Sequence, residues 1–297
     1  TFNNDLVSVS RILDFSAYLI ANRYSWESKD LSPAMASLEA ILARSGESYT
    51  QVADIEKMSE AEGEYPVGEV AGDVVRLALP DGHQQQPTIE LLNKAGIRID
   101  DYPSVSGKRR PTSNLSGVTI KVIRPQDMPL QVANGHFDLA VTGKDWLTEH
   151  LNQFPDSPVV ELLDLKFGWV RIVAVVSQDL PVTDTGGLRQ FWAERAVPIR
   201  VASEYINIAD KYARDNHLGL YRIIPTWGAT EAFLTEDADL LIENTQTGRT
   251  LAEHKLKIVE TLFESTARLI ANKNSITDAK KRKKIESIAK TLRSAVE

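Results

Sequence analysis

The sequence contains no cysteine among its 297 residues. This absence excludes disulfide bonds, thiolate zinc sites and cysteine nucleophiles, and it fits a reducing compartment. Long apolar runs are also missing, since none approaches the ~18 residues that a membrane helix needs. Basic residues are outnumbered by acidic ones, 34 to 41, and the net charge of −7 argues against neutralising the phosphates of a nucleic acid. We therefore expect a cytoplasmic protein that binds neither a membrane nor a nucleic acid.

Hydrophobic residues make up 42% of the sequence, which is enough to form folded cores. The length suggests about two domains. Residues 1–45 are helix-rich in pattern. Residues 46–73 are acidic and poor in large apolar side chains, which predicts a linker. The first residue is Thr1 rather than Met, so we expect a chain cut from something longer.

From residue 74 onward, short apolar runs alternate with helical patterns. Strands are expected at 74–79, 119–123, 137–141, 170–176, 199–202, 221–225 and 238–243, and helices at 88–95, 128–134, 145–151 and 206–216. Such alternation predicts an α/β protein with a largely parallel sheet. Because there are two sets of elements, we expect two lobes with a cleft between them.

An internal repeat links the two ends of the sequence. Residues 12–25 align without a gap with residues 262–275, with identical Ala, Leu, Ile, Ala, Asn and Ser positions. Chance similarity of two apolar strands is one explanation. Duplication is favoured because the match continues into a helical pattern in both copies.

The strongest chemical signal follows the strand expected at 238–243. The segment contains donors and a glycine, namely Asn244, Thr245, Gln246, Thr247, Gly248, Arg249 and Thr250. A strand, a Thr/Gly-rich turn and a helix expose backbone N–H groups to an anion. Glu243 at the strand end suits the hydroxyls of a ribose. An ordinary capped helix start would explain the same residues.

Two further candidates follow other strands. Thr142-Gly143-Lys144 precedes a helix and lies where open α/β sheets bind ligands, although the P-loop spacing is absent. In the first strand–helix turn, Asp81 and His83 flank Gly82. These two side chains could act as an acid–base pair, or the segment could be an ordinary exposed turn. The histidines show no metal-ligand spacing. The run 280–284 is basic and is expected to be a solvated face.

Taken together, these segments resemble the ATP phosphoribosyltransferase family, over about residues 74–275. The motifs that carry the resemblance are Leu77-Ala78-Leu79-Pro80 with Gly82, Val122-Ile123-Arg124-Pro125-Gln126-Asp127-Met128-Pro129, Thr142-Gly143-Lys144-Asp145-Trp146-Leu147, Gly228-Ala229-Thr230-Glu231, Thr247-Gly248-Arg249-Thr250-Leu251 and Ala267-Arg268-Leu269-Ile270-Ala271-Asn272. The resemblance implies a two-lobed α/β fold of the periplasmic-binding-protein type II kind, with a helical N-terminal extension. Lobe I would span 74–177 and 263–297, lobe II would span 178–262, and residues 1–45 would resemble the tail of a preceding copy.

The activity that the resemblance implies opens histidine biosynthesis. N1 of ATP attacks the anomeric carbon of phosphoribosyl diphosphate (PRPP), and pyrophosphate leaves with the help of Mg²⁺. By resemblance, Glu231, Glu243 and Lys144 are the catalytic candidates, and 244–250 bind PRPP. Asp81, Gly82, His83, Arg124 and Gly143 would face the ATP phosphates. Metal ligands are not identified. We expect a homo-oligomer and a separate regulatory partner subunit, as for short-form relatives.

Several residues depart from the family pattern. Asp81 and His83 stand where the family usually has Lys and Arg, and Glu243 replaces the usual Asp. Because two cations near a triphosphate are lost, a catalytically weak or non-catalytic paralogous subunit is the first alternative. A two-lobed solute-binding protein is the second.

Overall fold

The computed structural model describes residues 73–103, 109–195, 197–228, 230–234 and 236–297, with positions 30, 32, 33, 35–37 and 40. The first copy of the repeat and almost all of the expected linker lie outside the described residues. The chain divides into units Thr1–Val67 and Gly68–Glu297, and the second unit is described here. Among the described residues, no helix is long and apolar enough to cross a membrane.

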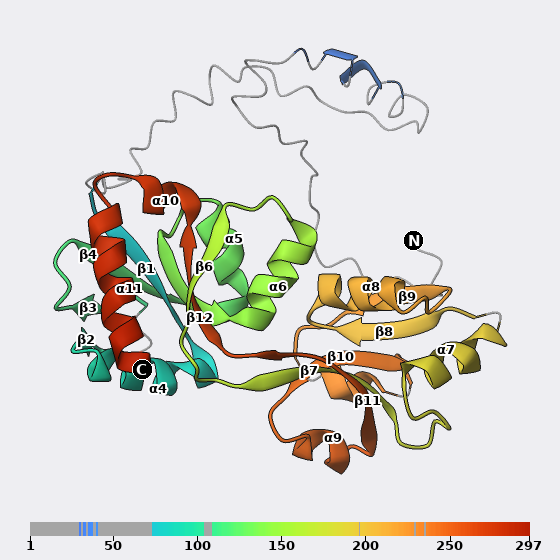
Figure 1. Cartoon of the computed structure of the whole chain (residues 1–297). Coiled ribbons are helices and arrows are strands. Elements are labelled where there is room, and N and C mark those ends of the chain that lie inside the picture. Colours follow the sequence, from blue (N-terminus) through green and yellow to red (C-terminus); the bar gives the residue numbers. More distant parts are fainter. Residues whose placement is uncertain are drawn as a thin grey trace, which may run out of the picture. The chain divides into compact units, whose positions relative to one another are not determined.

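Lobe I is built on a five-stranded sheet in the order β4-β1-β5-β12-β6. Its strands are β1 (Val75–Pro80), β4 (Val118–Ile123), β5 (Leu139–Gly143), β6 (Val159–Asp164) and β12 (Ala267–Asn272). Helices α4 (Gln85–Lys94) and α11 (Arg282–Val296) pack on one face, and α5 (Met128–Ala133) and α6 (Lys144–Gln153) on the other (Figure 1). The short β2 (Ile99–Asp100), β3 (Thr112–Ser113) and α10 (Lys273–Thr277) complete the lobe.

Lobe II repeats this plan with the strand order β11-β7-β10-β8-β9. Its strands are β7 (Val170–Ser177), β8 (Ile199–Ser203), β9 (Tyr221–Pro225), β10 (Leu240–Thr245) and β11 (Leu256–Ser265). Its helices are α7 (Thr185–Ala193), α8 (Ile206–Asp215) and α9 (Arg249–Glu253). The 3-10 turns η1 (Gly82–Gln84), η2 (Pro125–Asp127) and η3 (Thr230–Phe233) lie at the ends of strands.

Both sheets are buried on both faces, which explains why their strands read as continuous apolar runs. In β1, Leu77 and Leu79 face α4 and α11, whereas Ala78 between them faces α5 and α6. β10 alternates in the same way, with Leu240 and Ile242 on one side and Leu241 on the other. The period of two in side-chain direction thus gives each lobe two apolar layers.

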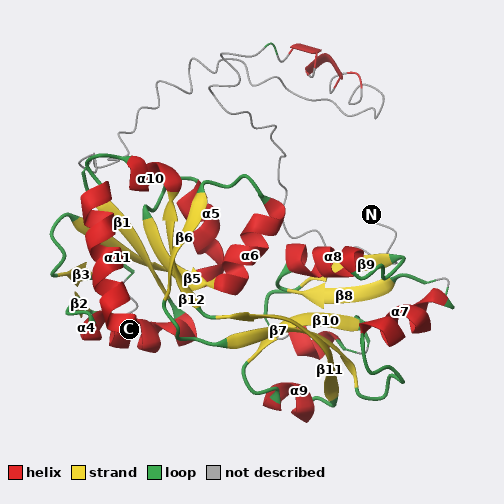
Figure 2. Ribbon diagram, viewed as in Figure 1, coloured by secondary structure: helices red, strands yellow, loops and turns green. Residues whose placement is uncertain are grey.

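The chain crosses between the lobes twice, from β6 to β7 and from β11 back to β12 (Figure 2). The predicted two-lobed α/β fold is therefore confirmed. The sheets are not wholly parallel, because β12 runs antiparallel to β5 and β6, and β7 runs antiparallel to β10 and β11. The two reversed strands directly follow the crossings.

Most predicted elements of the second unit are present, but β5 and β10 begin two residues later than expected. An aspartate before each strand explains the shift. Asp138 accepts from the backbone N–H and the guanidinium of Arg76 at 2.8 and 3.3 Å. Asp239 accepts from the same groups of Arg200 at 2.9 and 3.1 Å. In each lobe, the aspartate thus bonds the neighbouring strand through both its side chain and its backbone N–H.

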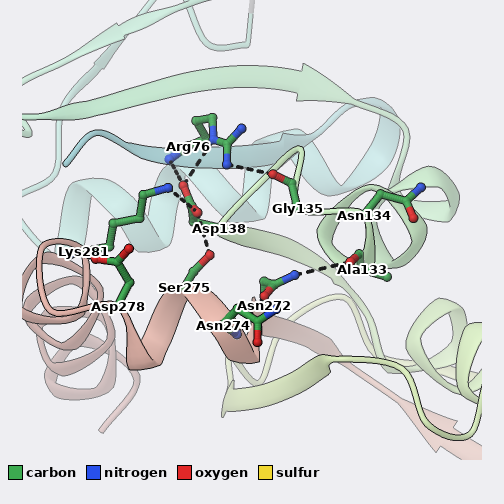
Figure 3. A pocket seen from close by; sticks show the side chains of 10 residues that line it. All are labelled: Arg76, Ala133, Asn134, Gly135, Asp138, Asn272, Asn274, Ser275, Asp278 and Lys281. Atoms are coloured by element: carbon green, nitrogen blue, oxygen red, sulfur yellow. Dashed lines mark hydrogen bonds and ion pairs between the residues drawn. The ribbon is translucent and has the colours of Figure 1, made fainter. Parts of the chain in front are cut away.

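A polar depression of about 280 Å³ lies at the amino ends of the parallel strands of lobe I, around the fully buried Asp138 (Figure 3). Ser275 and Lys281 donate to Asp138 at 2.6 and 2.9 Å. Burial would raise the pKa of Asp138, but the bonds from Ser275, Lys281 and Arg76 outweigh it and hold the pKa low. The expectation that 280–284 form a plain solvated face is therefore wrong at Lys281, which is 13% exposed, and at Lys284, which binds Asp73.

We predict that Asp138→Asn lowers the free energy of unfolding by about 2–3 kcal/mol, because it leaves Arg76 and Lys281 without their charged partner. Urea denaturation followed by circular dichroism measures the change. Asp215→Asn is the matched control, since Asp215 forms an exposed i,i+4 pair with Lys211 on α8. An equal effect of the two substitutions would contradict the prediction.

Candidate functional site

A cavity of about 350 Å³ lies where the carboxyl ends of strands from both lobes meet. Ligands of open α/β sheets bind at such strand ends. Five predicted site residues line it, namely Asp81, Gly82, His83, Arg124 and Asn244. Gln84, Pro125, Gln126, Asp145, Trp146, Gly168, Val170, Glu204 and Tyr205 complete the lining. The other predicted residues are not part of this lining.

The first strand–helix turn places Asp81 beside an arginine that the sequence did not single out. Arg109 Nη1 lies 2.7 Å from Asp81 Oδ2. The backbone explains this placement, because the N–H of Val122 in β4 donates to the carbonyl of Arg109. Gly82 adopts a φ of +70°, which favours glycine, and begins η1. A cation from another loop thus lies beside Asp81 in this turn.

Arg124 follows β4 and extends from lobe I toward the cavity. Its guanidinium donates to both carboxylate oxygens of Asp127, at 3.0 and 3.3 Å. The Asp127 carboxylate, and to a smaller extent Asp81 and Glu204, raise the pKa of Arg124. Since Glu204 belongs to lobe II, Arg124 interacts electrostatically with both sides of the cavity.

Gly143 and Lys144 form the junction between β5 and α6. A Cβ at Gly143 would collide with the Asp145 carboxylate, so the turn requires glycine. The Lys144 N–H donates to the carbonyl of Thr266 in the second crossing, at 3.0 Å. Its ammonium lies 5.8 Å from the ring centre of Phe263 on β11. The side chain therefore lies against lobe II.

Three glutamates interact on the lobe II side of the site. Burial, and then the charges of Glu204 and Glu231, raise the pKa of Glu243 to about 7, although Asn244 and Thr230 donate to it. Burial and Glu231 likewise raise the pKa of Glu204. Glu231 lies in η3. In the part of the chain that the structure describes, no group of three His, Asp or Glu side chains is placed to hold a metal ion.

The loop after β10 is held by its own threonines. Thr245 Oγ1 accepts from the N–H of Gly248 at 2.9 Å, and Thr247 Oγ1 accepts from that of Arg249 at 3.3 Å. Gly248 adopts a φ of +76° and is the N-cap residue of α9. Gln246 and Thr250 are exposed, and the exposed Arg249 pairs with Glu253 at 2.8 Å. The N–H groups of Gly248 and Arg249 are therefore bonded within the loop, and Asn244 joins the loop to the cavity.

Sequence reasoning missed Glu204, Tyr205 and Asp145, which line the cavity. Glu204 directly follows β8, so the strand-end rule that selected Lys144 could have found it. Asp145 belongs to the motif 142–147, but its position at the start of the helix expected at 145–151 gives it no role in the site. Arg109 gave no local signal, because β4 alone brings it to Asp81.

Comparison with known proteins identifies the family. The family model "HisG: ATP phosphoribosyltransferase" matches residues 124–294. The ATP phosphoribosyltransferase of Prosthecochloris aestuarii is 36% identical over 231 residues, which cover 75% of this chain and 72% of that relative. The one of Chlorobaculum parvum is 35% identical over 231 residues, covering 76% and 73%.

The fold is also that of a solved structure. The ATP phosphoribosyl transferase (HisG:HisZ) complex from Thermotoga maritima matches with a TM-score of 0.60 and 22% identity, covering 75% of this chain and 98% of that one. From the matched residues and the shared two-lobed fold, we conclude that this chain belongs to the ATP phosphoribosyltransferase family, whose members are glycosyltransferases of histidine biosynthesis.

Proposed function

We propose that this protein condenses ATP with PRPP through N1 of the adenine, forming phosphoribosyl-ATP and pyrophosphate. The observation that carries the proposal is the cavity at the strand ends, with arginines on the lobe I side and a donor-rich loop next to Glu243 on the lobe II side. Such an arrangement separates a triphosphate-binding side from a ribose-phosphate side.

On the lobe II side, the loop 244–250 would bind the 5-phosphate of PRPP through backbone N–H groups, hydroxyls and Arg249. Glu243 would accept hydrogen bonds from the ribose hydroxyls. A carboxylate in this place also stabilises the positive charge that develops on the sugar as the pyrophosphate leaves. Glu231 would act beside it.

On the lobe I side, Arg124 and Lys144 would bind phosphates, with Gly82, His83 and Gly143 allowing close approach. Arg109 would supply the second cation of the first turn. Two molecules held on facing lobes react as if in one molecule, which removes the entropic cost of their meeting. Catalysis would then rest mainly on positioning and electrostatics.

Mg²⁺ would enter as the counter-ion of the substrates' polyphosphates. Mg²⁺ commonly binds substrate phosphates and keeps several waters, so it needs few protein ligands. The donor set of the described residues agrees, because no three carboxylates or imidazoles converge on one point.

Release of pyrophosphate from ATP plus PRPP by the purified protein tests the proposal, with phosphoribosyl-ATP identified by mass spectrometry. Product formation dependent on both substrates is expected. Calorimetry that detects PRPP binding while no pyrophosphate forms would instead support a non-catalytic paralogous subunit, the alternative that Asp81 favours. If the protein shows no PRPP binding and no pyrophosphate release, both the catalytic and the non-catalytic function are rejected.

We predict that Asp81→Asn lowers the KM for ATP about threefold to tenfold, because it removes a carboxylate that now pairs with Arg109 and faces Arg124. Initial rates at low and high salt measure the change, which should shrink as salt screens the charges. Asp156→Asn, at an exposed position, controls for net charge. A higher KM in the Asp81 variant would contradict the role given to this turn.

We also propose that the chain associates with copies of itself and with a regulatory partner subunit. The Thermotoga protein named above was solved as a HisG:HisZ complex, which supports this expectation. Light scattering coupled to size-exclusion chromatography would measure the mass of the assembly. A monomeric mass at micromolar concentration would overturn the homo-oligomer.

A further inference from the structure

Lobes I and II also meet away from the two chain crossings. There α6 of lobe I packs against α8 of lobe II. The crossings alone leave a hinge, so this third contact fixes how far apart the two sides of the cavity stand.

The first turn of α8 is capped from the other lobe. The leading N–H groups of a helix find no partner inside it, and Tyr205 at the N-cap position offers no side-chain acceptor. Glu149 of α6 takes this role. Its Oε1 accepts from the N–H and the side-chain amide of Asn207 at 2.8 and 2.7 Å, and its Oε2 accepts from the N–H of Ile208 at 2.8 Å. The negative carboxylate also suits the positive end of the helix dipole.

A second buried contact lies one turn earlier on α6. The Tyr205 hydroxyl donates to Asp145 Oδ2 at 2.7 Å, and Ser265 donates to Asp145 Oδ1 at 2.7 Å. Tyr205 is 1% exposed and Asp145 is 6% exposed. Burial raises the pKa of Tyr205 well above its usual value, so its hydroxyl keeps the proton that it donates. Trp146 packs on the Tyr205 ring, with centroids 4.4 Å apart.

These contacts adjoin the candidate site. Asp145 follows Lys144, Tyr205 follows Glu204, and Asp145 and Tyr205 themselves line the cavity. A change in the α6–α8 contact would therefore move Lys144 relative to Glu204 across the cavity.

We propose that Glu149 is a positioning residue that latches lobe I to lobe II through the N-terminus of α8, and so sets the distance between the two bound substrates. This inference rests on the proposed function. Reacting atoms must lie about 3–3.5 Å apart and in line, so a small rotation between the lobes separates them. Burial raises the pKa of Glu149 despite its three hydrogen bonds, which means that desolvation offsets part of the gain. A latch balanced in this way can release to admit two polyanions.

The distance between the lobes provides a direct test. Because the chain has no cysteine, Gln153→Cys on α6 and Lys211→Cys on α8 can carry the only spin labels. Pulsed electron paramagnetic resonance should give a narrow distance distribution in the parent chain. We expect Glu149→Ala to broaden and lengthen it, Glu149→Gln to have an intermediate effect, and Glu286→Gln, at an exposed position of α11, to have none.

Kinetics give the second readout. If only a fraction of molecules is latched, the apparent affinity for both substrates falls by that fraction. We therefore expect Glu149→Ala to raise both KM values by the same factor, about tenfold for the loss of such a cap, with kcat changed less. Asn207→Ala removes only the side-chain donor, so it should raise both KM values by a smaller common factor. This variant replaces Glu149→Ala in the test if Glu149→Ala fails to fold.

An unchanged distance distribution in Glu149→Ala, or kcat and both KM values all unchanged, would overturn the latch. If the parent chain proves inactive, the proposed function fails, and the distance measurement still decides whether the latch exists.

Discussion

Glu243→Gln is expected to lower kcat/KM for PRPP by about a hundredfold. In the proposed complex the carboxylate accepts two hydrogen bonds from ribose hydroxyls, and hydrogen bonds to charged groups contribute about 1.5–3 kcal/mol each. The amide keeps one acceptor oxygen and loses the charge that stabilises the developing positive sugar. The substitution is close in shape, so the circular dichroism spectrum should not change.

The same variant should change the pH dependence of PRPP binding. The pKa of Glu243 is raised to about 7, because the side chain is partly desolvated and lies near Glu204 and Glu231. PRPP binding to the ionised form should therefore strengthen as pH rises from 6 to 8. Isothermal titration calorimetry measures the affinity for PRPP at each pH, and Glu243→Gln should remove the increase in affinity that comes from ionisation of Glu243. A phosphate loses its own second proton near pH ~6, so the difference between parent and variant is the informative quantity.

Stability should show the opposite sign. A folded-state pKa above the unfolded value means that the folded protein binds the proton more tightly, so this contribution is present at low pH and is lost as pH rises through about 7. The free energy of unfolding of the parent should fall between pH 5 and 8 relative to that of Glu243→Gln. Parallel curves for the two proteins would contradict the assignment.

Much of the fold could be predicted because both sheets are covered on both faces. Runs such as 221–225 and 170–176 are apolar apart from one arginine each, Arg222 and Arg171, and the structure places strands there. The strands β6 and β11 were missed, since their mixed residues, such as Glu161 in β6 and Glu260 in β11, break the apolar pattern. Tertiary contacts made by the crossings, rather than local preference, define them.

The repeat predicted from sequence acquires a physical meaning in its C-terminal copy. The identical positions are those that lobe I buries: Ala267, Leu269, Ile270 and Ala271 in β12 are 0% exposed. Asn272 caps α10, and Ser275 donates to Asp138. The residues that recur are thus buried or hydrogen-bonded in lobe I, and duplication stays a prediction.

The candidate site was predictable where residues directly follow a strand, as at Asp81 and Arg124, or lie in its last residues, as at Asn244. It was not predictable where one loop completes another. Arg109 reaches Asp81 from beside β4, and Glu149 reaches α8 from the other lobe. Pairings of this kind depend on how lobes and loops pack, and no spacing in the sequence encodes them.

Gly248→Val is expected to reduce PRPP binding by more than a hundredfold while leaving the fold intact. Gly248 adopts a φ of +76°, a region that a β-branched residue rarely enters. Its backbone N–H lies within the loop that would hold the 5-phosphate, and its bond to Thr245 keeps the turn in shape. Forcing the residue to negative φ would break this bond and change the shape of the loop that would face the anion, and each lost charge-assisted bond to the anion costs about 1.5–3 kcal/mol. Calorimetry with PRPP measures the loss.

Gly219→Val provides the matched control. Gly219 has a φ of +73°, and neither Gly219 nor Gly248 has an atom within 4 Å of an added Cβ. Both substitutions therefore introduce backbone strain without a steric clash, at a cost of order 1–3 kcal/mol each. Similar shifts in melting temperature are expected, with PRPP binding lost only in Gly248→Val. If the two variants bind PRPP equally well, the loop after β10 does not hold its phosphate. If both lose binding, the effect comes from global strain.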